Sequence, residues 1–548
     1  MPVSARVPDV LQTISQLPAD DVYTPPYVAN LVLDSLPGHV WTDCPEYRWL
    51  DPGAKSGVFL REAFRRLMDG LVSHFPSPRE RREHILRNMV FGAATTMLNG
   101  EMCRRTLYQS SDATGERIQD KELKDLVVVF SDSSGNIPYV RTEHTLDRSG
   151  KACSICRAPS GLIRDNRESF AYSFIHGTYP PRGIEEMQFD VIIGNPPYQI
   201  GMEDSDGNRT ANITPLYNLF VERAIEMNPR FVAMITPSRW FAGGKGLSNF
   251  RDAMISDRRL KSITDFPNPR EAFPTVEIKG GVSYFLWDRE WDGDCTFSSL
   301  RDGEVVSTDV RDLRKYGDVI LRDSSAVEIV DRVLSSEHLK VTMKEMVSTR
   351  DPFGQSITTN FKHSREKTFK GAIPLVFNNR IGYLRPEQIE RNLDWVDKWK
   401  VLIPVASDGV SRESASVLGE PIALAPGSAC TQSYLIAGVF DSQIEARNCA
   451  IFLTTKFCRY LVLQKKITQH TRSAMFSFLP LLDFKSKWTD EKLFALFELT
   501  AEQIGIIDRA IGPRDWIDSL DSSVPKTHLP GGRKYKSSSE DLDAGLEE

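Results

Sequence analysis

Short apolar runs alternate with amphipathic segments through the first 300 residues. Six runs have the length and composition of buried strands, and they lie at residues 47–50, 126–130, 189–193, 231–235, 260–264 and 281–287. Between several of them apolar residues recur at helical spacing, as in the segment 216–227. Strands that alternate with helices are typical of a parallel sheet with helices on both faces. The pattern therefore predicts a doubly wound α/β fold for residues 1–300.

Three further regions depart from this alternation. Residues 109–185 are polar and rich in turn formers, which predicts an insertion between two elements of the sheet. After residue 300 the apolar segments become irregular, with runs at 372–377 and 433–440, and we expect a second, α+β domain at 301–511. Residues 512–548 are polar and rich in Pro, Gly and Ser, so we expect a disordered tail there.

The composition narrows the class of protein. A chain of 548 residues is long enough for two or three domains, and its apolar runs are shorter than the roughly 18 residues of a membrane helix. Only Cys153 and Cys156 of its eight cysteines lie close in sequence, so we expect a reducing, cytoplasmic location without membrane contact. The net charge is −6, yet residues 341–480 carry an excess of six positive charges. That excess suits a polyanion-binding face, and it is also compatible with ordinary variation.

The first candidate ligand loop follows the run at 47–50 and reads Asp-Pro-Gly-Ala-Lys-Ser-Gly. In an open α/β sheet, ligands bind beyond the carboxyl ends of the strands. Gly53 and Gly57 allow a ligand to approach the backbone closely, and Asp51 offers an acceptor at the strand tip. The spacing differs from that of a phosphate-binding P-loop. An ordinary strand-to-helix turn has a similar composition, so this loop alone leaves both interpretations open.

The second candidate loop, Asn195-Pro196-Pro197-Tyr198, follows the run at 189–193. Two consecutive prolines fix two φ angles and remove two N–H donors. The side-chain oxygen of Asn195 and the carbonyl of Pro196 then become rigid acceptors, which suit the two hydrogens of an exocyclic amino group. A planar ring can stack on Tyr198, and such stacking contributes about 1–3 kcal/mol for a base. The loop therefore indicates a site for an amino-bearing ring; a stiff turn with a packed tyrosine is the alternative.

Three motifs in this order resemble those of the γ-class DNA adenine-N6 methyltransferases of restriction-modification systems, some of which are fused to a nuclease. The catalytic motif of that family matches residues 195–198, and its S-adenosylmethionine loop matches residues 51–57 followed by Val-Phe-Leu. The motif that precedes this loop matches residues 23–28, Tyr-Thr-Pro-Pro-Tyr-Val. The resemblance implies a Rossmann-like methyltransferase sheet within residues 1–300 and a target-recognition domain at 301–511.

The resemblance also implies a role for each matching residue. The cofactor would be S-adenosylmethionine, held by Tyr23, Thr24, Pro25, Asp51, Pro52, Gly53, Ser56 and Gly57. The catalytic residues would be Asn195, Pro196, Pro197 and Tyr198, acting on an adenine rotated out of double-stranded DNA. Its N6 would attack the sulfonium methyl in line, without a covalent enzyme intermediate. Tyr198 and Phe273 would stack on the two faces of the base, and a core position is the alternative for Phe273.

The chain departs from the family pattern at three places. Lys55 stands where the glycine loop usually has Gly, and residues 93–96, after the second strand, read Ala-Ala-Thr-Thr without the expected ribose-binding acid. The acid expected to hold the cofactor adenine is also missing from residues 176–178. These departures keep open a DNA-binding specificity subunit with a weakened cofactor site. Methylation of cytosine N4 is a second alternative, although Asn rather than Ser at position 195 favours adenine. Methylation of glutamine or of an RNA guanine is a third, which the large C-terminal region disfavours.

A candidate metal site lies in the insertion. Cys153 and Cys156 form a Cys-x-x-Cys pair, with His144 nine residues before it and His176 twenty residues after it. Two cysteines and two histidines suit tetrahedral zinc, which would stiffen a segment with few core residues. Two free thiols and two surface histidines are the alternative.

The DNA contacts are expected in the C-terminal region. The basic run 464–472 offers four candidate phosphate-binding side chains, Lys465, Lys466, His470 and Arg472. A solvated basic face is the alternative. The expected partners are double-stranded DNA and a separately encoded restriction enzyme or helicase-nuclease.

One pattern imitates a different enzyme class. Asp265 followed by Glu277-Ile278-Lys279 has the form of a magnesium-dependent nuclease motif. It falls where the methyltransferase interpretation needs a strand of the sheet and the loop that carries Phe273, so we do not expect nuclease chemistry there.

Overall fold

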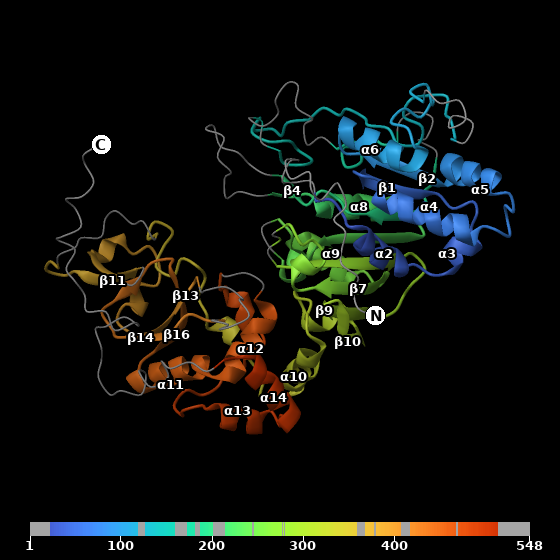
Figure 1. The fold of residues 1–548 in the computed structure, drawn as a ribbon. Coiled ribbons are helices and arrows are strands. Elements are labelled where there is room, and N and C mark those ends of the chain that lie inside the picture. The colour runs from blue at the N-terminus through green and yellow to red at the C-terminus, as the bar shows by residue number, and fades with distance from the viewer. Residues whose placement is uncertain are drawn as a thin grey trace. The chain divides into compact units, whose positions relative to one another are not determined.

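The computed structural model divides the chain into two compact units, Met1–Arg322 and Asp323–Glu548 (Figure 1). The residues that it describes are 22–118, 127–158, 160, 172–180, 187–200, 214–243, 246–276, 278, 280–358, 368–377, 380–406, 417–466 and 470–512. The expected tail at 512–548 therefore lies, apart from Gly512, outside the described residues.

The first unit is built on an eight-stranded sheet with the order β10-β9-β7-β8-β6-β3-β1-β2. The strands are β1 (Trp49–Ala54), β2 (Val90–Ala94), β3 (Val191–Gly194), β6 (Phe231–Pro237), β7 (Leu260–Phe266), β8 (Val282–Asp288), β9 (Cys295–Arg301) and β10 (Glu304–Arg311). Neighbours from β2 through β1 and β3 to β6 are parallel, whereas β8 runs antiparallel to both β6 and β7. A short hairpin, β4 (Gln199–Ile200) with β5 (Thr214–Pro215), lies outside this sheet.

Helices cover the sheet, and they are α2 (Pro26–Asp34), α3 (His39–Thr42), α4 (Val58–Gly70), α5 (Pro78–His84), α6 (Met97–Tyr108), α8 (Tyr217–Glu226) and α9 (Ser248–Ser256). A π-helical turn at Ile85–Met89 leads into β2. Helices α4 and α6 pack against β1 and β2, and α2 and α8 pack against β6 (Figure 1). Every residue of β1, β3 and β6 is buried, as expected for central strands covered on both faces. The predicted α/β sheet is confirmed.

Two details of the first unit differ from expectation. The run at 126–130 was expected to be a strand, but its described part, 127–130, forms none, and β2 pairs with β1 instead. The side chain of Phe130 packs against the ring of Tyr108, so this apolar residue anchors a loop instead of forming part of a strand. The unit also extends to Arg322 rather than ending near residue 300, because β9 and β10 continue the sheet.

The second unit combines two small sheets with helices, in keeping with the α+β expectation. Its strands are β11 (Ile373–Phe377), β12 (Arg380–Leu384), β13 (Trp399–Pro404), β14 (Ile422–Leu424), β15 (Ala429–Cys430) and β16 (Tyr434–Phe440). They form the sheets β12-β11-β15 and β14-β13-β16. Its helices are α10 (Ser324–Ser335), α11 (Gln443–Thr454), α12 (Lys456–Lys465), α13 (Asp490–Leu496) and α14 (Ala501–Ala510). In the part of both units that the structure describes, no helix has the length and apolar character of a membrane span.

Candidate active site

The two candidate ligand loops meet at the carboxyl edge of the first sheet. Strand β1 pairs in parallel with β2 on one side and with β3 on the other, where Trp49 lies opposite Val191. The chain therefore reverses its direction of strand addition at β1, which is the place where open α/β sheets bind ligands. Residues 51–54 form the end of β1, residues 55–57 follow it, and residues 195–198 follow β3 directly.

Two glycines let these loops lie against each other. Gly194 has φ +150°, and a Cβ added there would lie 2.7 Å from the Oδ1 of Asp51. A Cβ on Gly53 would lie 3.4 Å from the Cα of Pro196. The backbone N–H of Gly53 donates to Asp51 Oδ1 over 3.1 Å. The backbone of the loop at residues 51–57 is therefore in close contact with the backbone of the loop at residues 195–198.

Asp51 is buried beside a buried lysine. Burial raises the pKa of the Asp51 carboxyl to about 7, against the opposing effects of the Gly53 N–H and the charge of Lys55. The Nζ of Lys55 donates to the backbone carbonyl of Val22 over 3.2 Å. Lys55 therefore points into the site, where the family usually has glycine.

Asn195 is held by the N-terminal motif. Its Nδ2 donates to the carbonyl of Val22 over 3.1 Å and to Thr24 Oγ1 over 3.0 Å. Because a carbonyl oxygen only accepts, the bond to Val22 sets which end of the amide is Nδ2. The Oδ1 is buried and has no hydrogen-bond partner among the described residues, although the Asn195 side chain lies close enough to the Tyr198 hydroxyl to lower the pKa of that hydroxyl. Such a buried acceptor is costly unless a ligand donor meets it.

The two candidate stacking rings are neighbours but are not parallel. The ring centroids of Tyr198 and Phe273 are 6.4 Å apart, and their planes meet at 80°. Both side chains are buried, and burial raises the pKa of the Tyr198 hydroxyl. The hydroxyl of Tyr27 donates to the carbonyl of Ala272 over 2.9 Å, which ties α2 to the loop that carries Phe273. Two rings at this angle cannot both stack on one base unless one of them turns.

A polar cluster lies after β2, where the ribose-binding acid was expected. Tyr23 donates its hydroxyl hydrogen to Asn99 Oδ1 over 2.9 Å, and Asn99 Nδ2 donates to Thr95 Oγ1 over 2.7 Å. The hydroxyl of Thr96 accepts from the N–H of Asn99 and caps α6. The family pattern has a carboxylate at this position, and this pattern does not predict Asn99. The spacing Thr95-x-x-x-Asn99 at a helix start was the available signal.

The other expected cofactor residues lie around the same edge. Pro25, Pro52 and Ser56 are buried, and Gly57, with φ +78°, precedes α4. Tyr179, in the insertion, was not foreseen. Its hydroxyl is buried without a hydrogen-bond partner among the described residues, and burial, with the charge of Asp51, raises its pKa. No local pattern marks Tyr179, because the insertion has no regular periodicity.

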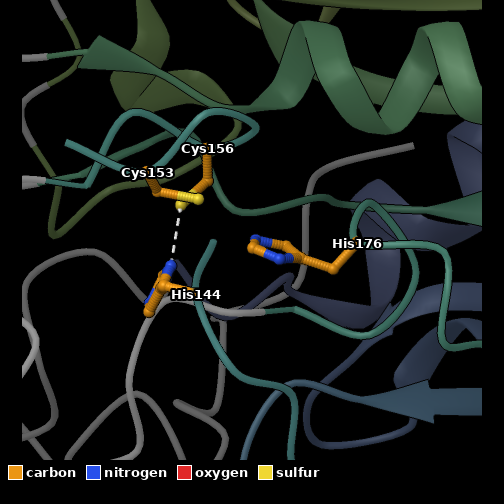
Figure 2. A group of neighbouring side chains, drawn as sticks. All are labelled: His144, Cys153, Cys156 and His176. Carbon is orange, nitrogen blue, oxygen red and sulfur yellow. Dashed lines mark hydrogen bonds between the residues drawn. The ribbon is translucent and has the colours of Figure 1, made fainter. Parts of the chain in front are cut away.

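The four expected metal ligands converge (Figure 2). One ligand atom from each of His144, Cys153, Cys156 and His176 lies within 4.8 Å of the other three. Burial lowers the pKa of both histidines, that of His176 to about 4 with a contribution from His144. Both imidazoles therefore present neutral ring nitrogens at neutral pH. Burial raises the pKa of the Cys156 thiol to about 12, and the N–H of Ala158 opposes this shift.

The candidate DNA contacts separate into two kinds. Lys465 and Lys466 are buried: Lys465 Nζ donates to Ser477 Oγ over 2.5 Å, and Lys466 Nζ donates to the carbonyl of Val417. Ammonium groups placed in this way are not available to a phosphate, so the expectation for these two lysines does not hold. His470 and Arg472 are exposed, and their role stays a prediction.

The carboxylate of Asp265 forms an ion pair with Arg322 and a hydrogen bond with Ser238 in the interior of the first unit. The carboxylate is fully buried and accepts from Nε and Nη2 of Arg322 over 2.8 and 2.9 Å, and from Ser238 Oγ over 2.6 Å. Glu277 and Lys279, the other charged members of the nuclease-like pattern, lie outside the described residues. The contacts of Asp265 favour the structural interpretation of that pattern.

Two sequence comparisons relate the chain to adenine-specific methylases and restriction-modification methylases. The Eco57I restriction-modification methylase family matches residues 88–273. A protein described as an uncharacterized adenine-specific methylase from Mycoplasma pneumoniae is 32% identical over 320 residues, which are 55% of this chain and 75% of that protein.

Among solved structures, the type I restriction-modification methyltransferase subunit from Streptococcus thermophilus is 14% identical, with a TM-score of 0.30, over 52% of this chain and 50% of that one. A nuclease-deletion mutant of the Type ISP restriction-modification enzyme LlaGI, in complex with a DNA substrate mimic, is 12% identical, with a TM-score of 0.45, over 79% of this chain and 44% of that one. The chain thus spans half the length or less of these two structures. The chain is 32% identical to the Mycoplasma protein over 75% of that protein's length. It therefore belongs to the family of adenine-specific methylases of restriction-modification type.

Proposed function

We propose that the protein is a site-specific DNA methyltransferase, which transfers a methyl group from S-adenosylmethionine to N6 of adenine in double-stranded DNA. The observation that carries the proposal is the buried Oδ1 of Asn195, which has no hydrogen-bond partner among the described residues and lies at the carboxyl edge of the sheet beside the glycine loop. An exocyclic amino group is a donor of the required kind.

The residues of the glycine loop suit S-adenosylmethionine, which when bound supplies an electrophilic methyl group on its sulfonium. Asp51 would accept from the ammonium end of the cofactor, and Lys55 would lie toward its carboxylate. The cluster of Tyr23, Thr95 and Asn99 would offer hydroxyl and amide groups where the family uses an acid. The buried hydroxyl of Tyr179 is a further polar group on this side.

Asn195 and Pro196 would hold the target amino group. The Oδ1 of Asn195 would accept one N6 hydrogen and the carbonyl of Pro196 the other, which would leave the nitrogen lone pair free to attack the methyl group. The new N–C bond would replace the S–C bond, whose electron pair stays on sulfur, and N6 would release one of its two protons to solvent. The bonds from Nδ2 to Val22 and Thr24 keep Oδ1 in place before the base arrives. Such preorganised acceptors stabilise a transition state without reorganising during the reaction.

Tyr198 and Phe273 would sandwich the adenine once it is rotated out of the duplex. Their present angle of 80° implies that one ring turns when the base enters. The second unit would read the DNA sequence, with His470 and Arg472 as phosphate contacts. The proposed setting is the bacterial cytoplasm, with a separately encoded restriction enzyme or helicase-nuclease as partner. Zinc would have no part in methyl transfer, since direct attack by N6 requires no metal.

The test is sequencing of plasmid DNA from a host without methyltransferases that expresses wild type, Asn195→Ala or Asn88→Ala. Asn88 is an exposed asparagine outside the site and serves as the matched control. We expect N6-methyladenine in one sequence context with wild type and Asn88→Ala, and none with Asn195→Ala. N4-methylcytosine instead would establish the cytosine alternative. An unmodified plasmid, together with no S-adenosylmethionine binding by calorimetry, would contradict the proposal in favour of a specificity subunit.

A further inference from the structure

The four side chains of Figure 2 have the spacing of a tetrahedral site. With Zn–S near 2.3 Å and Zn–N near 2.0 Å, the ligand atoms of such a site lie about 3.3 to 3.8 Å apart. The Sγ of Cys156 and the Nδ1 of His144 are 3.4 Å apart, and all four candidate atoms fall within 4.8 Å of one another. A small contraction around an ion would therefore complete the site.

The backbone around the two cysteines is already shaped for a metal. An antiparallel bridge joins Leu146 to Cys153, so a short turn presents the Cys153-x-x-Cys156 segment. The N–H of Ile155 donates to the Sγ of Cys153 over 3.4 Å, a contact that stabilises a thiolate. Arg157 closes the turn with φ +61°, which a non-glycine residue rarely adopts. Both thiols are free, and neither sulfur is accessible enough to serve as an exposed reactive group.

Each of the two histidines has a buried ring nitrogen without a hydrogen-bond partner among the described residues. The Nε2 atoms of His144 and His176 are buried, and neither has a hydrogen-bond partner in the described ranges. The centroids of the two imidazole rings lie 5.3 Å apart and their planes meet at 79°, and the Nδ1 of His144 points toward the Sγ of Cys156 (Figure 2). Buried polar atoms of this kind normally have a partner. An ion could be that partner for the Nε2 of His176, whereas His144 faces Cys156 through its Nδ1, so its own Nε2 would meet a different group.

We propose that His144, Cys153, Cys156 and His176 bind one structural zinc ion. Two thiolates would balance its charge, and the mixed N₂S₂ set suits zinc, which forms closed tetrahedral sites of this composition. Hard cations such as magnesium and calcium require oxygen ligands, and none of these four residues offers one.

The ion would fasten the insertion to the catalytic half of the unit. Cys153 and Cys156 pack with Leu216, the residue before α8. The N–H of Leu216 donates to the carbonyl of Tyr198 over 3.0 Å, so the metal cluster is two contacts from the catalytic loop. Tyr172 and Phe174 also pack on the ring of Phe220 in α8. Zinc would thus support the exit of the loop at residues 195–198.

The test is metal content by plasma mass spectrometry on the full chain purified without chelator, together with uptake of cobalt(II) by chelator-stripped protein. The variants are Cys156→Ser and His144→Ala, and the matched control is Cys44→Ser, a buried thiol outside the cluster. We expect one zinc per chain in wild type and control, and at least a tenfold loss in both cluster variants. Cobalt should produce the visible absorption of a tetrahedral thiolate site in wild type and in Cys44→Ser, but in neither cluster variant.

A chelator should lower the melting temperature of wild type but not that of Cys156→Ser. Should Cys156→Ser fail to fold, His144→Ala and the cobalt spectrum of wild type still decide the matter. Zinc-free wild type that takes up no cobalt would overturn the proposal, and so would equal zinc in wild type and His144→Ala. These readouts do not use methyl transfer, so failure of the zinc site and failure of the proposed enzymatic function are distinguishable.

Discussion

The side-chain amide of Asn195 donates to the hydroxyl of Thr24 over 3.0 Å, although 171 residues separate them in the chain. This bond joins the motif at residues 23–28 to the catalytic loop. The bond orients the amide oxygen of Asn195. Thr24, which we expect to contact the cofactor, therefore also positions the Oδ1 of Asn195, which we expect to contact the base.

We expect Thr24→Val to lower the rate of methyl transfer about fivefold, because loss of one hydrogen bond costs on the order of 1 kcal/mol. Thr24→Ser keeps the acceptor and should retain most of the rate. Single-turnover transfer of a labelled methyl group, at saturating cofactor, measures the effect. Equal rates for the valine and serine variants would show that the bond does not position Asn195.

Asp51→Asn should stabilise the protein at high pH while it abolishes cofactor binding. The folded-state pKa is raised from 3.8 to about 7, so the folded state holds the proton more tightly than the unfolded state. The favourable contribution of Asp51 is complete below about pH 4 and is lost as the pH rises through about 7.

The gain in the free energy of unfolding of Asp51→Asn over wild type should therefore grow from pH 5 to pH 8, to a few kcal/mol at most. Urea denaturation at several pH values measures this gain, and calorimetry measures binding of S-adenosylmethionine. A gain that does not change with pH would refute the assignment of a raised pKa.

Gly194→Ala should lower both stability and cofactor affinity. The added Cβ would lie 2.7 Å from Asp51 Oδ1, and the backbone at φ +150° disfavours a side chain. Gly317→Ala is the matched control, since Gly317 has φ +70° and open space around it. The control should cost about 1–3 kcal/mol from the backbone alone, because Gly317 has φ +70° and ψ −111°, and it should leave binding unchanged. Similar cofactor affinity in both variants would mean that the contact between the two loops is not needed.

Phe273→Ala should weaken capture of the flipped base about 5- to 100-fold, which corresponds to about 1–3 kcal/mol of stacking. The fluorescence of 2-aminopurine at the target position, measured against enzyme concentration, reports this capture. Phe250→Ala removes another buried ring of the same unit, one that packs on Tyr217 and Trp240, and it should leave base capture intact. If Phe250→Ala has the same effect, Phe273 acts only through the stability of the core.

Arg472→Ala and Lys466→Ala should have different effects, although both residues belong to one basic run. Arg472 is exposed, so its loss should leave stability unchanged and reduce the slope of log Kd against log salt by about 0.9. Lys466 is buried and donates to Val417, so its loss should lower the melting temperature without changing that slope. Fluorescence anisotropy over a salt series, together with thermal melts, separates the two effects. An unchanged slope for Arg472→Ala would remove it from the DNA-binding face.

The sequence by itself determined the features that depend on neighbouring residues. Alternating runs predicted the α/β sheet, because strand and helix impose different spacings on apolar residues. The stiff backbone of residues 195–198, and with it the fixed carbonyl of Pro196, follows from two prolines that need no distant partner to fix their φ angles. The Cys-x-x-Cys pair indicated the proposed metal site in the same way, since two of the four candidate ligands lie three positions apart in the chain.

Only the tertiary structure decided what long-range contacts control. Strand pairing between distant segments decided three features of the first unit. It made β8 antiparallel to its neighbours, placed β2 rather than residues 126–130 beside β1, and extended the unit to Arg322. Burial of Lys465 and Lys466 could not be foreseen from a run of charges, because a basic helix end has the same composition whether it faces solvent or core. The same holds for Asn195: its residue type indicated an acceptor, but the bonds to Val22 and Thr24 that aim this acceptor exist only when the folded sheet brings the two segments together.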